Sequence, residues 1–383
     1  MMDHIPFDTV LYWIDIALFL IFIISVGYTL VFALASLRKM GRQYPEAKKQ
    51  YRYCLLIPAP EGFDGNLLES VRSLDNMDYP GNLFDVVVST NGLLPETKEA
   101  LTTLHVTLLE QPASVSSPKA LLEAAIKTLS SKDYDVLVLL NANNLVDPTY
   151  LTDINKAYHS GGMAIQTHKV SKKYPTHLSW LNALMEEVNN SLFRRGHVNL
   201  GFSSSLMGTG MAFEFDWFKQ NADFKGNVDI SKYLEAKLLK QGIFIEYLEH
   251  VYTYEDSVLN VVAYNKQRKE WTSTGANTRH YIVRDLPRAL FAGNLDYGDK
   301  ILQWMMPSKI LLLGFLFIIA GLLSYYEPTL SVKWWIMTGT LLFAYVMAIP
   351  DKMLTFRTLW AVILLPILFL SVILNKLFTR SKR

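Results

Sequence analysis

The sequence has few residues that cross-link a chain and no marked excess of charge. Its 383 residues include one cysteine, Cys54, which excludes an internal disulfide and a cysteine-based zinc cluster. Because Cys54 lies inside the apolar run 53–57, we expect a small core side chain there. The formal net charge is +2, so without a large basic excess we expect no nucleic-acid partner.

Charge is also nearly absent from a long run close to the N-terminus. Residues 10–37 contain one charged side chain, Asp15, and about 20 apolar residues are enough to cross a bilayer. We therefore expect a transmembrane anchor over residues 1–37. Its leading flank is acidic, with Asp3 and Asp8, which is not typical of a cleaved signal peptide. Basic residues follow it instead, and the positive-inside rule then predicts that the middle of the chain is cytoplasmic: Arg38, Lys39, Arg42, Lys48, Lys49 and Arg52.

Three more apolar runs, 310–325, 334–349 and 359–374, predict a C-terminal membrane region over 309–383 with two or three helices. The first two runs are short, so a re-entrant or interfacial position for one of them stays open. Between 278 and 308, aromatic side chains, arginines and leucines alternate, which is typical of an amphipathic segment in the interface. We expect a multi-pass integral protein of the plasma or inner membrane, with lipid as a partner and the soluble part cytoplasmic.

The middle of the chain, residues 38–277, alternates short apolar runs with helical patterns, which predicts an α/β domain. Helices are expected from Ser117-Pro118 to Leu129, and from residue 230 to residue 240 after Asp229. The predicted strands are 53–57, 84–89, 104–109, 135–140 and 163–168.

The run Val136 to Leu140 reads as a strand buried on both faces at the centre of a parallel sheet. Two polar side chains, Asn141 and Asn143, follow at its C-terminal tip, where open α/β sheets place their ligands.

Five landmarks then occur in a known order. They are Ile57-Pro58-Ala59, the strand end 86–91, Asn141-Ala142-Asn143, the stretch from Gly208-Thr209-Gly210 to Phe213, and the pair Asn227-Val228-Asp229 with Gln267-Arg268-Lys269-Glu270-Trp271. In these the chain resembles the membrane-anchored family 2 glycosyltransferases of the cellulose and hyaluronan synthase group. The resemblance implies a Rossmann-like GT-A domain flanked by transmembrane helices. It also implies inverting transfer of a hexosyl-type sugar from a nucleotide-sugar donor to a lipid or polysaccharide acceptor at the cytoplasmic face.

The resemblance also assigns roles. Asp229 would be the general base. The nucleotide sugar would contact Pro58, Thr90, Asn91, Lys119, Asn141 and Asn143, and the acceptor or the diphosphate would contact Gly208, Gly210, Gln267, Arg268 and Trp271. Plainer interpretations stay open beside these roles: a helix cap for Asp229, solvated charges for Lys119 and Arg268, a membrane anchor for Trp271 and a tight turn at the glycines.

Several positions differ from the family pattern. Thr90 stands at or near a nucleotide-binding aspartate, Glu270 replaces an arginine, and Asn141 and Asn143 replace the Asp-x-Asp metal motif. Mg²⁺ and Mn²⁺ prefer anionic oxygen ligands, whereas asparagine offers a neutral carbonyl. Asn141 and Asn143 are therefore weak metal candidates, and they can equally cap the strand and turn.

Two functions follow from these differences. One is a divergent membrane glycosyltransferase with weak metal dependence. The other is a catalytically inactive pseudo-glycosyltransferase that acts as a scaffold or regulator with other glycan-assembly proteins. A transporter is disfavoured, because the apolar runs, Asp15 apart, lack the internal ionisable residues usually found along a substrate path.

Overall fold

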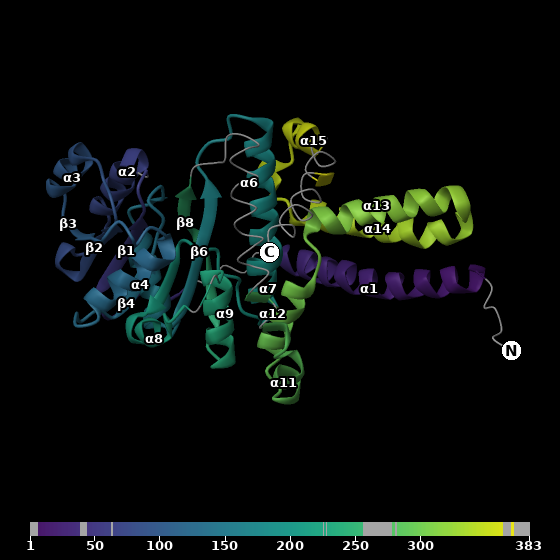
Figure 1. The fold of residues 1–383 in the computed structure, drawn as a ribbon, viewed down its shortest axis with the longest axis horizontal. Helices are drawn as coiled ribbons and strands as arrows, with labels where there is room; N and C mark the ends of the chain where they lie inside the picture. The colour runs from purple at the N-terminus through teal and green to yellow at the C-terminus, as the bar shows by residue number, and fades with distance from the viewer. Residues whose placement is uncertain are drawn as a thin grey trace.

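The computed structural model describes residues 7–38, 44–62, 64–224, 226, 228–255, 278–279, 282–362 and 369–370. An α/β domain occupies one side of the molecule, and three long helices, α1, α13 and α14, extend side by side from it (Figure 1). The helices are α1 Phe7–Ser36, α2 Asp64–Asp75, α3 Pro95–Thr102, α4 Pro118–Leu129, α5 Tyr150–His159, α6 His177–Asn190, α7 His197–Asn199, α8 Phe215–Asn221, α9 Ile230–Lys240, α11 Leu286–Phe291, α12 Leu295–Met305, α13 Lys309–Tyr326, α14 Pro328–Ala348 and α15 Phe356–Val362, with shorter helical turns η1 Gly81–Leu83, η2 Ser191–Gly196 and η3 Asp351–Met353.

A mixed eight-stranded sheet has the strand order β3-β2-β1-β4-β7-β6-β8-β5. The first four run parallel, β7 is antiparallel to both β4 and β6, β8 is parallel to β6, and β5 is antiparallel to β8. The strands are β1 Tyr53–Ala59, β2 Phe84–Thr90, β3 Val106–Glu110, β4 Val136–Leu139, β5 Leu145–Val146, β6 Ala164–Ser171, β7 Met211–Glu214 and β8 Ile245–Glu255.

Alternation along the strands divides the core into two layers, because successive side chains point to opposite faces of a sheet. Cys54 and Leu56 of β1 pack with α4, α8, α9 and α12, whereas Leu55 and Ile57 pack with α2, α3 and α5. Cys54 is a fully buried core residue, as expected from its apolar surroundings.

All five predicted strands are present, and both predicted helix starts are confirmed. The Ser117 hydroxyl accepts a hydrogen bond from the Ala120 amide at 3.1 Å, and Asp229 accepts one from the Lys232 amide at 3.2 Å. The expectation that β4 lies within a parallel sheet is wrong on one side, where β7 pairs with it antiparallel. An unbroken apolar run reports burial on two faces, which β4 has, and carries no information on the direction of its neighbours.

The three long helices are apolar enough to cross a membrane, with candidate spans at Leu11–Ser36, Lys309–Tyr326 and Pro328–Ala348. The 30 residues of α1 extend about 45 Å, longer than the roughly 30 Å apolar layer of a bilayer. The C-terminal end of α1 packs against the α/β domain, where the Phe32 ring stacks on the His197 ring with centroids 3.7 Å apart. Most of the predicted run 359–374 lies outside the described residues.

The segment 278–308, predicted to lie in the membrane interface, contains α11 and α12. These two helices lie at the end of the three-helix bundle that adjoins the α/β domain (Figure 1). One side of these helices is buried, with Tyr297 and Ile301 in the core of the α/β domain. The other side is bare: Phe291 is 94% exposed and Leu295 is 65% exposed. This division fits the predicted amphipathic character.

Candidate active site

The ends of β1 and β2 place three of the predicted nucleotide-binding residues at one edge of the sheet. Pro58 pairs with Ser89, and Ala59 pairs with Thr90, in the parallel register. Thr90 is only 1% exposed, and its hydroxyl accepts a hydrogen bond from the Gly92 amide at 3.3 Å. Asn91 accepts one from the Glu61 amide at 3.0 Å. Thr90 and Asn91 therefore shape the two loops at this edge, and Thr90 has little surface left for a ligand.

The turn after β4 is organised by a residue that the sequence analysis did not single out, Asn144. This side chain is fully buried, and its Oδ1 accepts hydrogen bonds from the Asn141 amide at 2.7 Å and from the Thr209 hydroxyl. A third asparagine directly after the Asn-x-Asn pair was the available indication, since asparagine often bonds a nearby backbone group in turns. Asn144 thus joins the tip of β4 to the loop that precedes β7.

Asn141 faces a carboxylate. Its Nδ2 donates to Glu255 Oε1 at 3.2 Å, and the other oxygen of Glu255 forms an ion pair with Lys169. Because a carboxylate only accepts hydrogen bonds, the amide nitrogen of Asn141 must face Glu255 and the amide oxygen must face away. Asn143 is half-buried and has no side-chain hydrogen bond among the described residues. Glu255 and Lys169 were also not predicted, because they are distant in the sequence from the motif.

The loop 207–210 needs both of its glycines. Gly208 and Gly210 have φ of +83° and +61°, values that other residues adopt at a cost. A Cβ on Gly210 would lie 2.5 Å from the Thr253 hydroxyl oxygen, so this glycine also permits a close approach to β8. The buried side chain of Gln166 donates to the carbonyl oxygens of Thr209 at 3.0 Å and Gly210 at 3.2 Å, which fixes the loop against β6.

Gly208 leads on to the predicted base. A Cβ at Gly208 would lie 3.4 Å from the hydroxyl oxygen of Ser231, in the first turn of α9. Asp229 caps that helix, and its carboxylate also binds the Lys232 ammonium at 3.1 Å. The capping interpretation of Asp229 is therefore confirmed, while its catalytic role stays a prediction.

Lys119, at the start of α4, reaches the loop that leads into α9. Its ammonium donates to the carbonyl oxygen of Gly226 at 2.6 Å. Lys119 is thus bonded to the loop three residues before Asp229, and the nucleotide-binding role of Lys119 stays a prediction. The other three predicted site residues, Gln267, Arg268 and Trp271, lie outside the described residues.

The residues at the Asn-x-Asn turn do not fit a divalent metal ion. Asn141 presents its nitrogen to Glu255, the oxygen of Asn144 already accepts two hydrogen bonds, and Glu255 is neutralised by Lys169. Hard cations prefer several anionic oxygens. Within the described ranges no group of three histidine, cysteine, aspartate or glutamate side chains is arranged to hold a metal.

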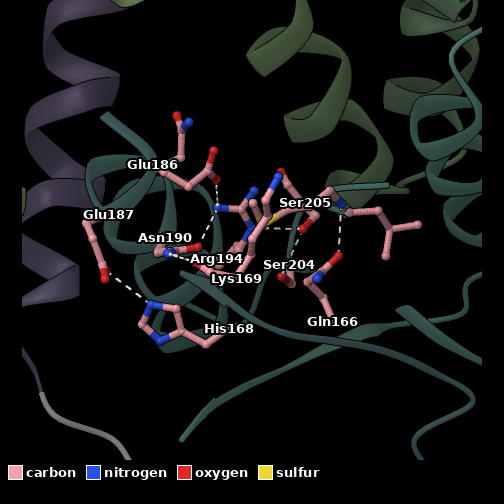
Figure 2. A network of polar contacts seen from close by, with 12 residues as sticks. Gln166, His168, Lys169, Glu186, Glu187, Asn190, Arg194, Ser204 and Ser205 are labelled. Atoms are coloured by element: carbon pink, nitrogen blue, oxygen red, sulfur yellow. Dashed lines mark hydrogen bonds and ion pairs between the residues drawn. The ribbon is translucent and has the colours of Figure 1, made fainter. Parts of the chain in front are cut away.

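Lys169 also takes part in a buried polar network between β6 and the helices α6 and η2 (Figure 2). Asn190 donates to the Lys169 carbonyl oxygen at 3.0 Å, and Arg194 donates to Asn190 Oδ1 at 2.8 Å. Arg194 also lies 3.5 Å from Glu186 in an ion pair. Burial disfavours the charge on Lys169, but the carboxylates of Glu255 and Glu186 outweigh it and raise the pKa of Lys169 above its ordinary value. Lys169 is therefore a cation at neutral pH.

Comparison with known proteins identifies the fold. A profile of the glycosyl transferase family group 2 matches residues 136–374, more than half of the chain. The chain belongs to that family. No curated protein sequence matches this glycosyltransferase-family chain.

A solved structure shares the architecture of the glycosyltransferase domain. The mannosyltransferase PcManGT from Pyrobaculum calidifontis, in complex with GDP-Man and Mn²⁺, superposes with a TM-score of 0.53 at 17% identity, over 85% of this chain and 97% of that chain. Residues 1–349 of S. aureus TarS superpose at 0.43 with 12% identity, over 79% of this chain and 82% of that chain. The same part of TarS in complex with UDP-GlcNAc gives 0.44 with 10% identity, over the same shares. The predicted GT-A fold is confirmed.

Proposed function

We propose that this protein is a membrane glycosyltransferase that transfers a sugar from a nucleotide-sugar donor to a lipid or polysaccharide acceptor at the cytoplasmic face. One observation carries the proposal: the tip of β4, the loop 207–210 and the start of α9 lie next to one another, since the Asn141 amide bonds the Thr209 hydroxyl and a Cβ at Gly208 would lie 3.4 Å from the hydroxyl oxygen of Ser231. In the family pattern these are the donor, acceptor and base positions. The complexes of PcManGT with GDP-Man and of TarS with UDP-GlcNAc support a nucleotide-sugar donor.

The residues present can divide the chemistry among them. Lys119 and Arg268 would neutralise the leaving diphosphate, since lysine and arginine bind phosphate oxygens directly. Asp229 would take the proton of the acceptor hydroxyl, for which it must exchange its contact with the Lys232 ammonium for the acceptor. Gly208 and Gly210 would let the acceptor approach the backbone, and Trp271 would stack on an acceptor sugar.

The membrane assignment rests on the three apolar helices and on the basic residues after α1. The far ends of α1, α13 and α14 lie together, so that α1 and α14 would enter from one side and α13 would return to it (Figure 1). This arrangement leaves the α/β domain on the side of the basic segment 38–52, which is cytoplasmic under the positive-inside rule.

A second function, a pseudo-glycosyltransferase that acts as a scaffold with other glycan-assembly proteins, is favoured by a separate observation. Thr90 is buried, and the Asn-x-Asn turn is bonded to protein groups where a donor and metal would be expected. A site whose polar groups are satisfied internally can persist for stability alone.

The two functions are separated by binding and turnover of the full chain in detergent. Calorimetry with GDP-mannose and UDP-N-acetylglucosamine should detect a donor, and an enzyme should then release the nucleoside diphosphate. Asp229→Asn keeps a good helix cap while removing the base, so turnover should fall by at least about 100-fold with little change in thermal stability.

The matched control is Asp216→Asn. Asp216 forms an i,i+3 ion pair with Lys219, as Asp229 does with Lys232, but it lies at the start of α8. Turnover should survive this change. Donor binding without turnover would favour the scaffold, and absence of donor binding to any common nucleotide sugar would refute the enzyme.

A further inference from the structure

The Asn141 side chain at the tip of β4 bonds a carboxylate that is itself paired with a lysine. The Glu255 carboxylate lies at the end of β8, where one oxygen accepts from Asn141 and the other is paired with Lys169 of β6. The side chains of Lys169 and Glu255 are only 14% and 15% exposed. A buried ion pair is tolerated where further hydrogen bonds satisfy both partners, and here Asn141 supplies one of them.

The topology explains how the three residues meet. β4, β6 and β8 all run in one direction, because β7 between β4 and β6 is antiparallel to both and β8 is parallel to β6. Their C-terminal ends therefore share one edge of the sheet. Lys169 and Glu255 occupy the last part of their strands, and Asn141 follows the end of β4.

The charges at this edge are balanced without a bound ion. Glu255 contributes one negative charge and Lys169 one positive charge, and the two asparagines contribute none. If Asn141 were an aspartate, a second negative charge would lie beside Glu255, and a single ammonium group would not neutralise both. The asparagines and the lysine are thus complementary, whereas a metal needs the carboxylates free.

We propose that Lys169 is the resident cation of this site: its ion pair with Glu255 positions Asn141, replaces the divalent metal of the Asp-x-Asp motif, and makes nucleotide-sugar binding independent of divalent cations. The inference about the donor rests on the proposed glycosyltransferase function. The inference about the cation does not, because it concerns which ion this edge of the sheet can accept. Lys169 and Glu255 act through Asn141 and are positioning residues.

The first test uses Mn²⁺ alone and needs no donor. Electron paramagnetic resonance measures free Mn²⁺ in titrations of the full chain in detergent. The wild-type protein and the Asn141→Asp/Asn143→Asp variant should bind weakly, because Lys169 occupies Glu255. Adding Lys169→Met to the double variant frees the Glu255 carboxylate in addition to the two new aspartates and should tighten Mn²⁺ binding by at least about tenfold, the scale of effects from groups that contact metal ligands.

Two further variants keep this test decisive. Lys169→Arg in the same double-aspartate background retains the positive charge and should show no such gain. If the methionine variant does not fold, Lys169→Gln replaces it, since glutamine removes the charge and keeps a hydrogen-bond donor for Glu255. Equal Mn²⁺ affinity with and without the Lys169 charge would overturn the proposal.

The second test measures donor affinity by calorimetry, with EDTA and with Mn²⁺. Wild-type affinity should be the same in both within about twofold, and Lys169→Met should weaken it by about tenfold without rescue by Mn²⁺. Lys172→Met is the control, because Lys172 has the same 14% exposure and pairs with a different carboxylate, Glu69. A wild-type affinity that rises more than about tenfold with Mn²⁺ refutes the inference. Absence of donor binding in every condition refutes the proposed function instead, and the Mn²⁺ titration still decides the role of Lys169.

Discussion

The ion pair between α1 and α14 allows the energetics of the helix bundle to be tested. Asp15 is 8% exposed, and its carboxylate is paired with Lys333 and accepts from the Trp334 indole nitrogen at 2.7 Å. Lys333 is 30% exposed, and its ammonium lies 5.0 Å from the centre of the Phe19 ring. Helix α14 begins at Pro328 and so includes Lys333, which the predicted run 334–349 had left out.

Lys333→Met should be the most costly single change at this pair. It leaves the Asp15 carboxylate with the indole as its remaining described partner, and removing one member of a buried pair costs about 3–5 kcal/mol. Because Lys333 is almost one-third exposed, we expect about 2 kcal/mol. Asp15→Asn should cost less, since the amide oxygen still accepts from Trp334 and the lysine can reach the interface. The double variant should recover most of the loss.

The assay is reversible unfolding in mixed detergent micelles, followed by far-UV circular dichroism and analysed as a double-mutant cycle. The expected coupling free energy is about 1.5–2 kcal/mol. Thr340→Val, at a partly exposed position of α14, serves as a control and should shift stability by less than about 0.5 kcal/mol. If the two single losses add to give the loss of the double variant, then the pair does not hold α1 to α14 and the reasoning fails.

Three further predictions concern the domain. Gly210→Ala combines a positive φ with overlap of Thr167 and should destabilise by about 2–4 kcal/mol, read as a fall in melting temperature. Gly196→Ala places a methyl group against the carbonyl oxygen of Phe32 and should separate α1 from η2, with a similar fall. Burial opposes ionisation of Glu187, but the hydrogen bond from His168 of β6 lowers the pKa of the Glu187 carboxyl. The ionised Glu187 should therefore contribute its full stabilisation at neutral pH, and this contribution should be lost as the pH falls below about 4.

Each glycine variant has a control at a glycine with open space around it, and the pH dependence has a control variant at Glu187. Gly201 has a φ of +84° and open space, so Gly201→Ala should cost only about 1 kcal/mol. Gly27→Ala, in an open part of α1, should be close to neutral or stabilising. Glu187→Gln should give a melting-temperature profile that converges with that of the wild type in acid. The Glu187 expectation is wrong if the melting temperatures of the wild type and Glu187→Gln differ by the same amount down to low pH. The glycine expectations are wrong if Gly210→Ala and Gly196→Ala lower the melting temperature no more than their controls do.

Much of the domain could be predicted because its elements carry local signals. Five strands, the capped helices after Ser117 and Asp229, and the apolar helices were all indicated by short stretches of sequence. Strand β8 was not, because residues 245–255 mix buried and exposed positions and the register shifts between Thr167 and His168 of its partner strand. A regular alternation, which is the usual indication of a strand, is therefore absent.

The roles that the motifs assign to the site residues stay predictions, but some of these residues lie near one another. Asn141 bonds the loop that contains Gly208 and Gly210, and Lys119 bonds the loop before Asp229. The ion pair that Asn141 contacts could not be predicted: Lys169 and Glu255 lie 28 and 114 residues from Asn141 in the sequence, and only the pairing of β6 with β8 brings them together. No local pattern reports such a long-range pair.

The packing of α1 has a practical consequence for handling this protein. Phe32 and Ala33 share a buried cluster with Val188 and Leu192 of the α/β domain and with Ala344 of α14. Tyr28 adds a hydrogen bond of 3.0 Å to Asp299. Removing the whole N-terminal helix to improve solubility would therefore expose the apolar surface around Val188 and Leu192, and the fragment would be prone to aggregate. A truncation that begins within α1 but N-terminal to Tyr28 would keep these contacts with the α/β domain and is the better place to divide the chain.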